Sequence, residues 1–162
     1  MGLPRRHRRP HRPPDHQQPL NDHQEQQMTT SQQTPALTIT SFGYGHQDHG
    51  HAPDAHLTLD LRPHFRDPHV NPALREMTGR DHEVITAVLG TPGIPELIAA
   101  TVQAARAFLA GPSAGPLAIA VGCVGGRHRS YVVASTLGAA LADLAPDVVH
   151  LHVDRPVLHR TT

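Results

Sequence analysis

Residues 117–130 read LAIAVGCVGGRHRS, and this stretch decides how the rest of the chain can be arranged. The apolar run from Leu117 to Val121 is typical of a buried strand, and it stops at a cluster of glycines. An alanine-rich segment with helical periodicity follows. A strand, a glycine loop and a helix start in that order direct several backbone N–H groups toward one point, beside the positive end of the helix dipole. The stretch therefore predicts an anion-binding loop.

Nine consecutive residues form this loop and the start of the helix behind it, and all of them are candidate ligand contacts. Two arginines and a histidine add positive charge to the glycines at the point where the amides converge. The candidates are Gly122, Cys123, Val124, Gly125, Gly126, Arg127, His128, Arg129 and Ser130.

The composition of the whole chain narrows the classes of protein. The length of 162 residues allows one domain and a tail, and the formal net charge of +0 indicates neither a nucleic-acid nor a membrane partner. No Trp is present, and an aromatic content of 3% argues against a stacking platform for single-stranded nucleic acid. The single cysteine is typical of a reducing compartment. No apolar run approaches the ~20 residues that span a bilayer, so we expect a cytoplasmic protein without a membrane partner.

The N-terminal segment 1–34 differs from the rest of the chain. It is rich in Pro, Gln, His and Arg and has almost no aliphatic residues, so it cannot bury enough apolar surface to offset its ordering entropy. We therefore expect a disordered tail, followed by a folded domain over residues 36–158. Five arginines between Arg5 and Arg12 form either a basic arm for RNA or a solvated stretch. The solvated stretch is the preferred interpretation.

The order of the expected elements indicates an α/β fold. Alternating or β-branched residues predict strands at 36–42, 57–61, 117–121 and 148–153. Helical spacing predicts a helix capped by Asp81, a second from Pro95 to about Leu109, and a third over about 129–144. Three prolines within 63–72 predict a loop. The result is a small parallel or mixed sheet of about four strands flanked by helices.

The second expected strand delivers two charged residues to the same edge of the sheet as the glycine loop. Asp60 and Arg62 lie at its carboxyl end. In open α/β sheets the ligand crevice lies outside the carboxyl ends of the strands. We therefore expect Asp60, Arg62 and the loop after Gly122 to share one crevice. By contrast, the histidine-rich loop 46–56 lacks a spacing that fixes a metal geometry, and we expect neither a metal site nor a cofactor.

One alternative is enzymatic. Cys123 and Arg129 have the Cys-x5-Arg spacing of cysteine-dependent phosphatases, in which a thiolate attacks phosphorus. A cysteine beside two arginines and a helix N-terminus is expected to have a lowered pKa. Asp60 or Asp67 would supply the acid for the leaving group. A non-catalytic binding loop with a small buried Cys is the preferred interpretation, because so short a pattern also arises by chance.

Four separate motifs resemble the C-terminal domain of the RapZ/YvcJ family and occur in that family's order. Residues 122–130 resemble its GCTGGKHRS or GCTGGRHRS signature, and residues 41–44 resemble its SFGY element. Asp60-Leu61-Arg62 followed by Asp67-Pro68-His69 resembles its DxR…NPH segment, and residues 74–79 resemble its LRPMTG segment. The resemblance covers roughly residues 38–156, and thus identifies the expected domain 36–158 as RapZ C-terminal-like.

The resemblance implies a metabolite sensor and not an enzyme. Family members normally carry an N-terminal P-loop domain, whose GxxxxGK[ST] pattern this sequence lacks. Their C-terminal domain is implied to sense glucosamine-6-phosphate, to bind small RNAs in some bacteria, and to form a homodimer. In this sequence, residues 125–130 would then take the phosphate, and Asp60, Arg62 and His69 would face the same pocket.

The departures from the family pattern leave the phosphorylated ligand open. Val124 stands where the family has Thr, which removes a hydroxyl. After Pro156, His159 and Arg160 are all that remains of the family's basic tail. A nucleotide therefore stays beside the amino-sugar phosphate as an expected ligand class.

Overall fold

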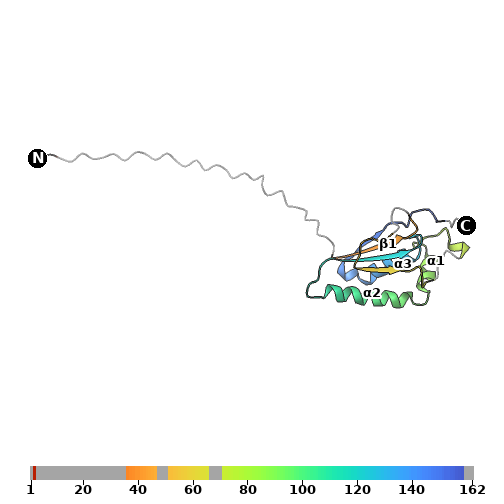
Figure 1. Ribbon diagram of the computed structural model, residues 1–162, viewed down its shortest axis with the longest axis horizontal. Helices are drawn as coiled ribbons and strands as arrows, with labels where there is room; N and C mark the ends of the chain where they lie inside the picture. The colour runs from red at the N-terminus through yellow and green to blue at the C-terminus, as the bar shows by residue number, and fades with distance from the viewer. Residues whose placement is uncertain (1, 3–35, 47–50, 66–70, 159–162) are drawn as a thin grey trace. The chain divides into compact units, whose positions relative to one another are not determined.

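The computed structural model describes residues 2, 36–46, 51–65 and 71–158, so nearly all of the expected tail 1–34 lies outside the described residues. The described domain falls within a single compact unit, Gln33–Thr162. Its elements follow one another as β1 (Leu37–Gly43), β2 (Leu57–Asp60), η3 (Pro72–Leu74), α1 (His82–Leu89), α2 (Ile94–Leu109), β3 (Leu117–Cys123), α3 (Arg129–Ala140), η4 (Ala142–Leu144) and β4 (Asp147–His150), as Figure 1 shows.

The four strands form one sheet in the order β2-β3-β1-β4, and every pair is parallel. This confirms the expected α/β class and selects the parallel over the mixed sheet. β1 and β3 lie at the centre and pair along their whole length, from Leu37 with Leu117 to Gly43 with Cys123. The carboxyl ends of the two central strands therefore lie side by side, and the loops that follow them leave the sheet together.

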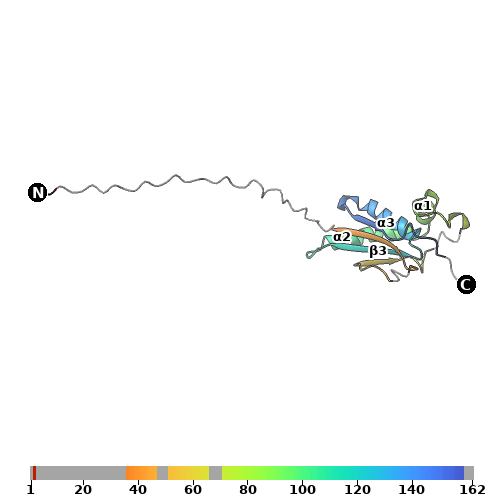
Figure 2. The ribbon, with the colours of Figure 1, turned by 90° about the horizontal axis from the view of Figure 1, so that it is seen from above.

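The two faces of the sheet differ in character. Residues such as Ile39, Ile119 and Val121 are fully or almost fully buried and share one core cluster with Val133 and Leu137 of α3. The helices α1, α2 and α3 contact one another and contribute to the same core cluster, and Figure 2 shows α3 and α1 on one side of the strands. Small or hydroxylated residues alternate with the core residues on the other face, among them Thr38, Thr40, Thr58 and Ala118. None of the described helices covers this second face.

The long helix α2 begins and ends where its sequence dictates. Gly93 at its N-cap has a φ of 89°, a left-handed conformation that favours glycine, and Pro95 follows in the first turn, where its missing N–H costs nothing. Ile94, Ile98, Thr101 and Ala105 recur at helical spacing and form the buried stripe. The helix ends at Leu109, as its sequence predicts.

Two expected elements are shorter than the sequence suggests. The helix expected over 129–144 is interrupted after Ala140, and a separate 3-10 turn follows at 142–144. The strand expected over 148–153 ends at His150, because His152 turns its ring inward and accepts the N–H of Gly43 at 2.8 Å. That side chain takes the place of a strand carbonyl. Pro72 also opens a 3-10 turn where only loop was expected.

Among the residues that the structure describes, no single helix has the length and apolar character needed to cross a membrane. The pair α1 and α2 passes the same test of length and composition only when the two are joined across an 82° bend.

Candidate functional site

The glycine loop after β3 is built on a close approach to the end of β1. A Cβ on Gly43 would lie 2.5 Å from the carbonyl carbon of Gly125 and 2.6 Å from the nitrogen of Gly126. Gly126 itself has a φ of 73°. The amide of Tyr44 donates to the Cys123 carbonyl at 2.9 Å, so the two chains remain paired past the sheet edge. Glycine is therefore required on both sides of this contact.

The thiol of Cys123 lies beneath the loop and not on its outer surface. The side chain belongs to the core cluster and is 3% exposed. Its sulfur accepts the N–H of Gly126 at 3.2 Å and lies 3.2 Å from the hydroxyl oxygen of the fully buried Ser130. Ser130 is the second residue of α3. The thiol thus joins the loop backbone to the first turn of the helix.

The two residues before α3 fasten the loop to a distant segment of the chain. Arg127 donates to the carbonyl of Glu76 at 3.0 Å and also to the carbonyl of Arg155. The ring Nε2 of His128 lies 2.9 Å from the carbonyl oxygen of Met77, and His128 is buried. Arg127 and His128, which the sequence predicts as anion ligands, therefore hold the segments around residues 76–77 and 155 against the loop.

Arg129 is buried inside the site, with 3% exposure. Its Nη1 donates to the carbonyl oxygens of Leu61 and Phe65, each at 2.7 Å. These carbonyls belong to the loop that follows β2, so Arg129 fixes that loop against the start of α3. Through these two hydrogen bonds, Arg129 positions the segment that carries Asp60 and Arg62.

Asp60 and Arg62 form the outer wall of the site. Arg62 grips both carboxylate oxygens of Asp60, with Nε 2.9 Å from Oδ1 and Nη2 2.6 Å from Oδ2. The guanidinium carbon of Arg62 lies 3.5 Å from the centroid of the Tyr44 ring. The hydrogen bond from Arg62 lowers the pKa of Asp60, and burial, followed by the charge of Asp60, raises the pKa of Tyr44. At neutral pH the wall thus presents a carboxylate, a guanidinium and a neutral phenol.

The structure brings most of the predicted residues together at one edge of the sheet. Asp60 is the direct register partner of Gly122, and the amide of Leu61 donates to the Gly122 carbonyl at 2.9 Å. The expected convergence of the β2 end with the glycine loop is therefore present. His69 and Asp67 lie outside the described residues. No group of three or more His, Cys, Asp or Glu side chains in the described ranges could hold a metal ion.

Sequence reasoning missed the residues that support the loop from behind. The rings of His46 and His152 lie 4.3 Å apart, centroid to centroid, and both side chains are buried. His46 Nε2 lies 3.1 Å from the carbonyl oxygen of Gly125, while His152 Nδ1 accepts from the Gly43 amide. The one available signal was the position of Gly43 at the end of an expected strand, where a backbone N–H needs an acceptor such as the His152 ring.

This arrangement defines a class of protein: a parallel α/β domain in which a glycine loop joins a central strand to a helix N-terminus, with a paired carboxylate and guanidinium beside it. Within that class, the chain belongs to the RapZ C-terminal domain family, whose sequence profile matches residues 35–155. The resemblance of its motifs to this family is therefore confirmed.

Individual relatives agree with the family match. The chain is similar to nucleotide-binding proteins of Thermus thermophilus (39% identical over 74% of this chain), Parafrankia (40% over 72%) and Thermobifida fusca (36% over 72%). It covers only 43%, 40% and 39% of those proteins, respectively, so it spans about two fifths of the relatives that it matches.

The contact between Gly43 and the glycine loop leads to a stability prediction. We expect Gly43→Ala to lower the free energy of unfolding by about 1–3 kcal/mol, because the new methyl group meets backbone atoms that cannot rotate away. Gly125→Ala is the control within the same loop, since a Cβ there meets nothing within 4 Å. Urea unfolding followed by circular dichroism measures both. Equal stability of the two variants would show that the loop does not pack on Gly43 as described.

Proposed function

We propose that this chain is a non-catalytic, regulatory domain of RapZ C-terminal type that binds a phosphorylated metabolite at the glycine loop. The observation that carries the proposal is the geometry at the end of β3. Residues 124–128 connect β3 to α3, which has 12 residues and no side-chain cap at its N-terminus. The backbone N–H groups and the dipole of such a helix end favour an anion.

The two arginines at the start of α3 limit how the anion would be held. Arg127 and Arg129 are engaged with backbone carbonyls, so their charge supports the site from within. The backbone amides of the loop and helix start would make the direct contacts, together with the guanidinium of Arg62, whose side chain is 42% exposed. A phosphate group suits this set of donors because it offers several acceptor oxygens.

Asp60 favours an amino sugar as the other part of the ligand. Its carboxylate is 32% exposed and negatively charged. Each oxygen already accepts two hydrogen bonds from Arg62, so a donor group of the ligand would share these oxygens with Arg62. An ammonium group or a sugar hydroxyl is the matching donor, as in glucosamine-6-phosphate, the ligand that the family resemblance implies. The name nucleotide-binding protein, which several relatives carry, makes a nucleotide the other ligand class.

The proposal includes three further features, namely the location of the chain, its oligomeric state and a second kind of partner. The chain acts in the cytoplasm, it forms a homodimer, and RNA is a further partner, reached through the arginines near the N-terminus. Support for a dimer comes from the sheet face with Thr38 and Thr40, which the described helices leave uncovered. RNA contacts through arginines alone would be salt-sensitive and without sequence preference.

The ligand proposal predicts a preference that depends on one carboxylate. By calorimetry, the chain should bind glucosamine-6-phosphate at least about tenfold more tightly than glucose-6-phosphate, because a charge-assisted hydrogen bond contributes about 1.5–3 kcal/mol. Asp60→Asn should remove this preference and leave the binding of glucose-6-phosphate nearly unchanged. Arg129→Ala is a poorer test, since it also releases the loop after β2.

Asp143, which lies outside the site, provides a matched control. Asp143 forms an exposed two-point pair with Arg106 that copies the Asp60–Arg62 pair. Asp143→Asn should retain the full preference. Failure of the wild-type chain to bind either sugar phosphate, with binding of a nucleoside monophosphate instead, would replace the amino sugar by a nucleotide.

A Cys123-dependent phosphatase is the second candidate. Its support is the Cys-x5-Arg spacing of Cys123 and Arg129, together with a sulfur that already accepts a loop N–H and lies beside the Ser130 hydroxyl. Against it stands the burial of the thiol, which leaves no approach for phosphorus without movement of the loop.

The phosphatase proposal has a direct test. If it holds, the chain turns over p-nitrophenyl phosphate, and Cys123→Ser abolishes turnover while leaving the melting temperature within a few degrees of the wild type. Our leading proposal instead expects no turnover between pH 5 and 8 in either protein. Turnover that survives in Cys123→Ser would exclude this cysteine as the nucleophile.

A further inference from the structure

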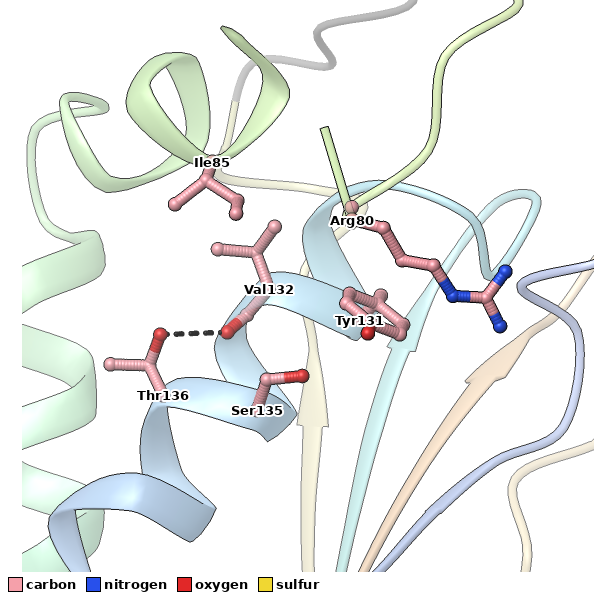
Figure 3. A pocket seen from close by; sticks show the side chains of 7 residues that line it. Arg80, Ile85, Tyr131, Val132, Ser135 and Thr136 are labelled. Atoms are coloured by element: carbon pink, nitrogen blue, oxygen red, sulfur yellow. Dashed lines mark hydrogen bonds between the residues drawn. The ribbon is translucent and has the colours of Figure 1, made fainter. Parts of the chain in front are cut away.

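A hollow lies between α1 and α3, next to the glycine loop but formed by other residues. Its volume is about 270 Å³, and its walls are formed by Gly79, Arg80, Ile85, Tyr131, Val132, Ser135 and Thr136. Figure 3 shows Ile85 of α1 facing Val132 of α3 across the space, with Thr136, Ser135 and Tyr131 around the base. None of these residues belongs to the loop 122–130 or to the Asp60–Arg62 wall.

The hollow has one anchored polar group at its base. The hydroxyl oxygen of Ser135 lies 3.3 Å from Nε2 of His150, and Nδ1 of the same ring lies 2.7 Å from the hydroxyl oxygen of Ser41. Burial lowers the pKa of His150, and the charge of Arg80 lowers it further, so the ring is neutral at neutral pH. Ser135 is thus held by a fixed imidazole and keeps further hydrogen-bonding capacity for a molecule in the hollow.

The other walls offer contact without charge. The ring of Tyr131 stacks on His150 with centroids 4.1 Å apart, and the backbone of Gly79 packs so closely on Tyr131 that a Cβ there would overlap the ring. Thr136 uses its hydroxyl to donate to the Val132 carbonyl at 2.8 Å. The charge at the rim is already neutralised, because the guanidinium of Arg80 pairs with Asp154. In Figure 3 that guanidinium points past Tyr131, away from Ile85.

These properties select a ligand class. A charged group would be desolvated here without an available partner, which is costly. A volume of about 270 Å³ is just below the range of pockets for drug-sized ligands, so a single ring fits. A hydroxyl on that ring can both donate and accept, and it therefore suits Ser135 whichever nitrogen of His150 carries the proton. We propose that the hollow between α1 and α3 is a second binding site, for a small uncharged ring compound that bears a hydroxyl group.

Phenol and toluene are a matched probe pair, because the hydroxyl group of phenol is replaced by a methyl group of similar size in toluene. In a titration of the full chain followed by ¹H–¹⁵N NMR, both should shift amides around Ile85 and Ser135, and phenol should bind about fivefold more tightly, the value of one neutral hydrogen bond. Ser135→Ala should erase the preference while toluene binds as before. Ser113→Ala, at an exposed serine outside the hollow, should behave like the wild type.

A second variant separates the wall from the anchor. Ile85→Ala should weaken phenol and toluene by the same factor and leave the preference intact, because it removes only apolar contact. The proposal fails if phenol shifts no amide around Ile85 and Ser135, if toluene binds as well as phenol to the wild type, or if the preference survives in Ser135→Ala. None of these outcomes depends on ligand binding at the glycine loop, so this proposal and the sugar-phosphate proposal can fail separately.

Discussion

The contact on which the rest of the site depends is that of the β1 end with the glycine loop. With a hydrogen atom as the side chain of Gly43, the backbone at Gly125 and Gly126 can lie directly against the strand. That approach lets the loop continue the pairing of β1 and β3 beyond the sheet edge. It also places His152, whose ring accepts the Gly43 amide, behind the loop. A side chain at Gly43 would separate all three segments at once.

The charged residues that follow the loop stabilise its surroundings before they bind any ligand. A guanidinium that is withdrawn from water needs hydrogen bonds, and backbone carbonyls accept them without cancelling the charge. Arg127 connects the loop to carbonyls near residues 76 and 155, and Arg129 connects it to carbonyls at 61 and 65. The positive potential of the site is therefore supplied by groups whose hydrogen bonds also fix its shape. The exposed pair Asp60–Arg62 is the part that remains free to discriminate among ligands.

The sequence was sufficient to predict the features that depend on a local pattern or on which residues stand at the carboxyl ends of the strands. The apolar run before Gly122 and the position of Asp60 at a strand end place both at one sheet edge, and the parallel register bears this out. Pattern also located α2 from its proline and apolar stripe. Hydrogen bonds made by long side chains to distant segments leave no such pattern. Arg127 donates to the carbonyl of Glu76, 51 positions away, and no periodicity in the sequence predicts that partner. The inward turn of His152, which ends β4 early, is hidden for the same reason.

Helix α3 links the two places that we assign to ligands. Its first turn carries Ser130 under the glycine loop, and Ser135, little more than one turn later, forms the base of the hollow. The amide of Gly79 in the wall of the hollow donates to the carbonyl of Arg127 at 2.7 Å, which gives a second connection. Because both places contact α3, a ligand at one would change the affinity at the other only if it bound two arrangements of α3 unequally, and the effect would then be reciprocal.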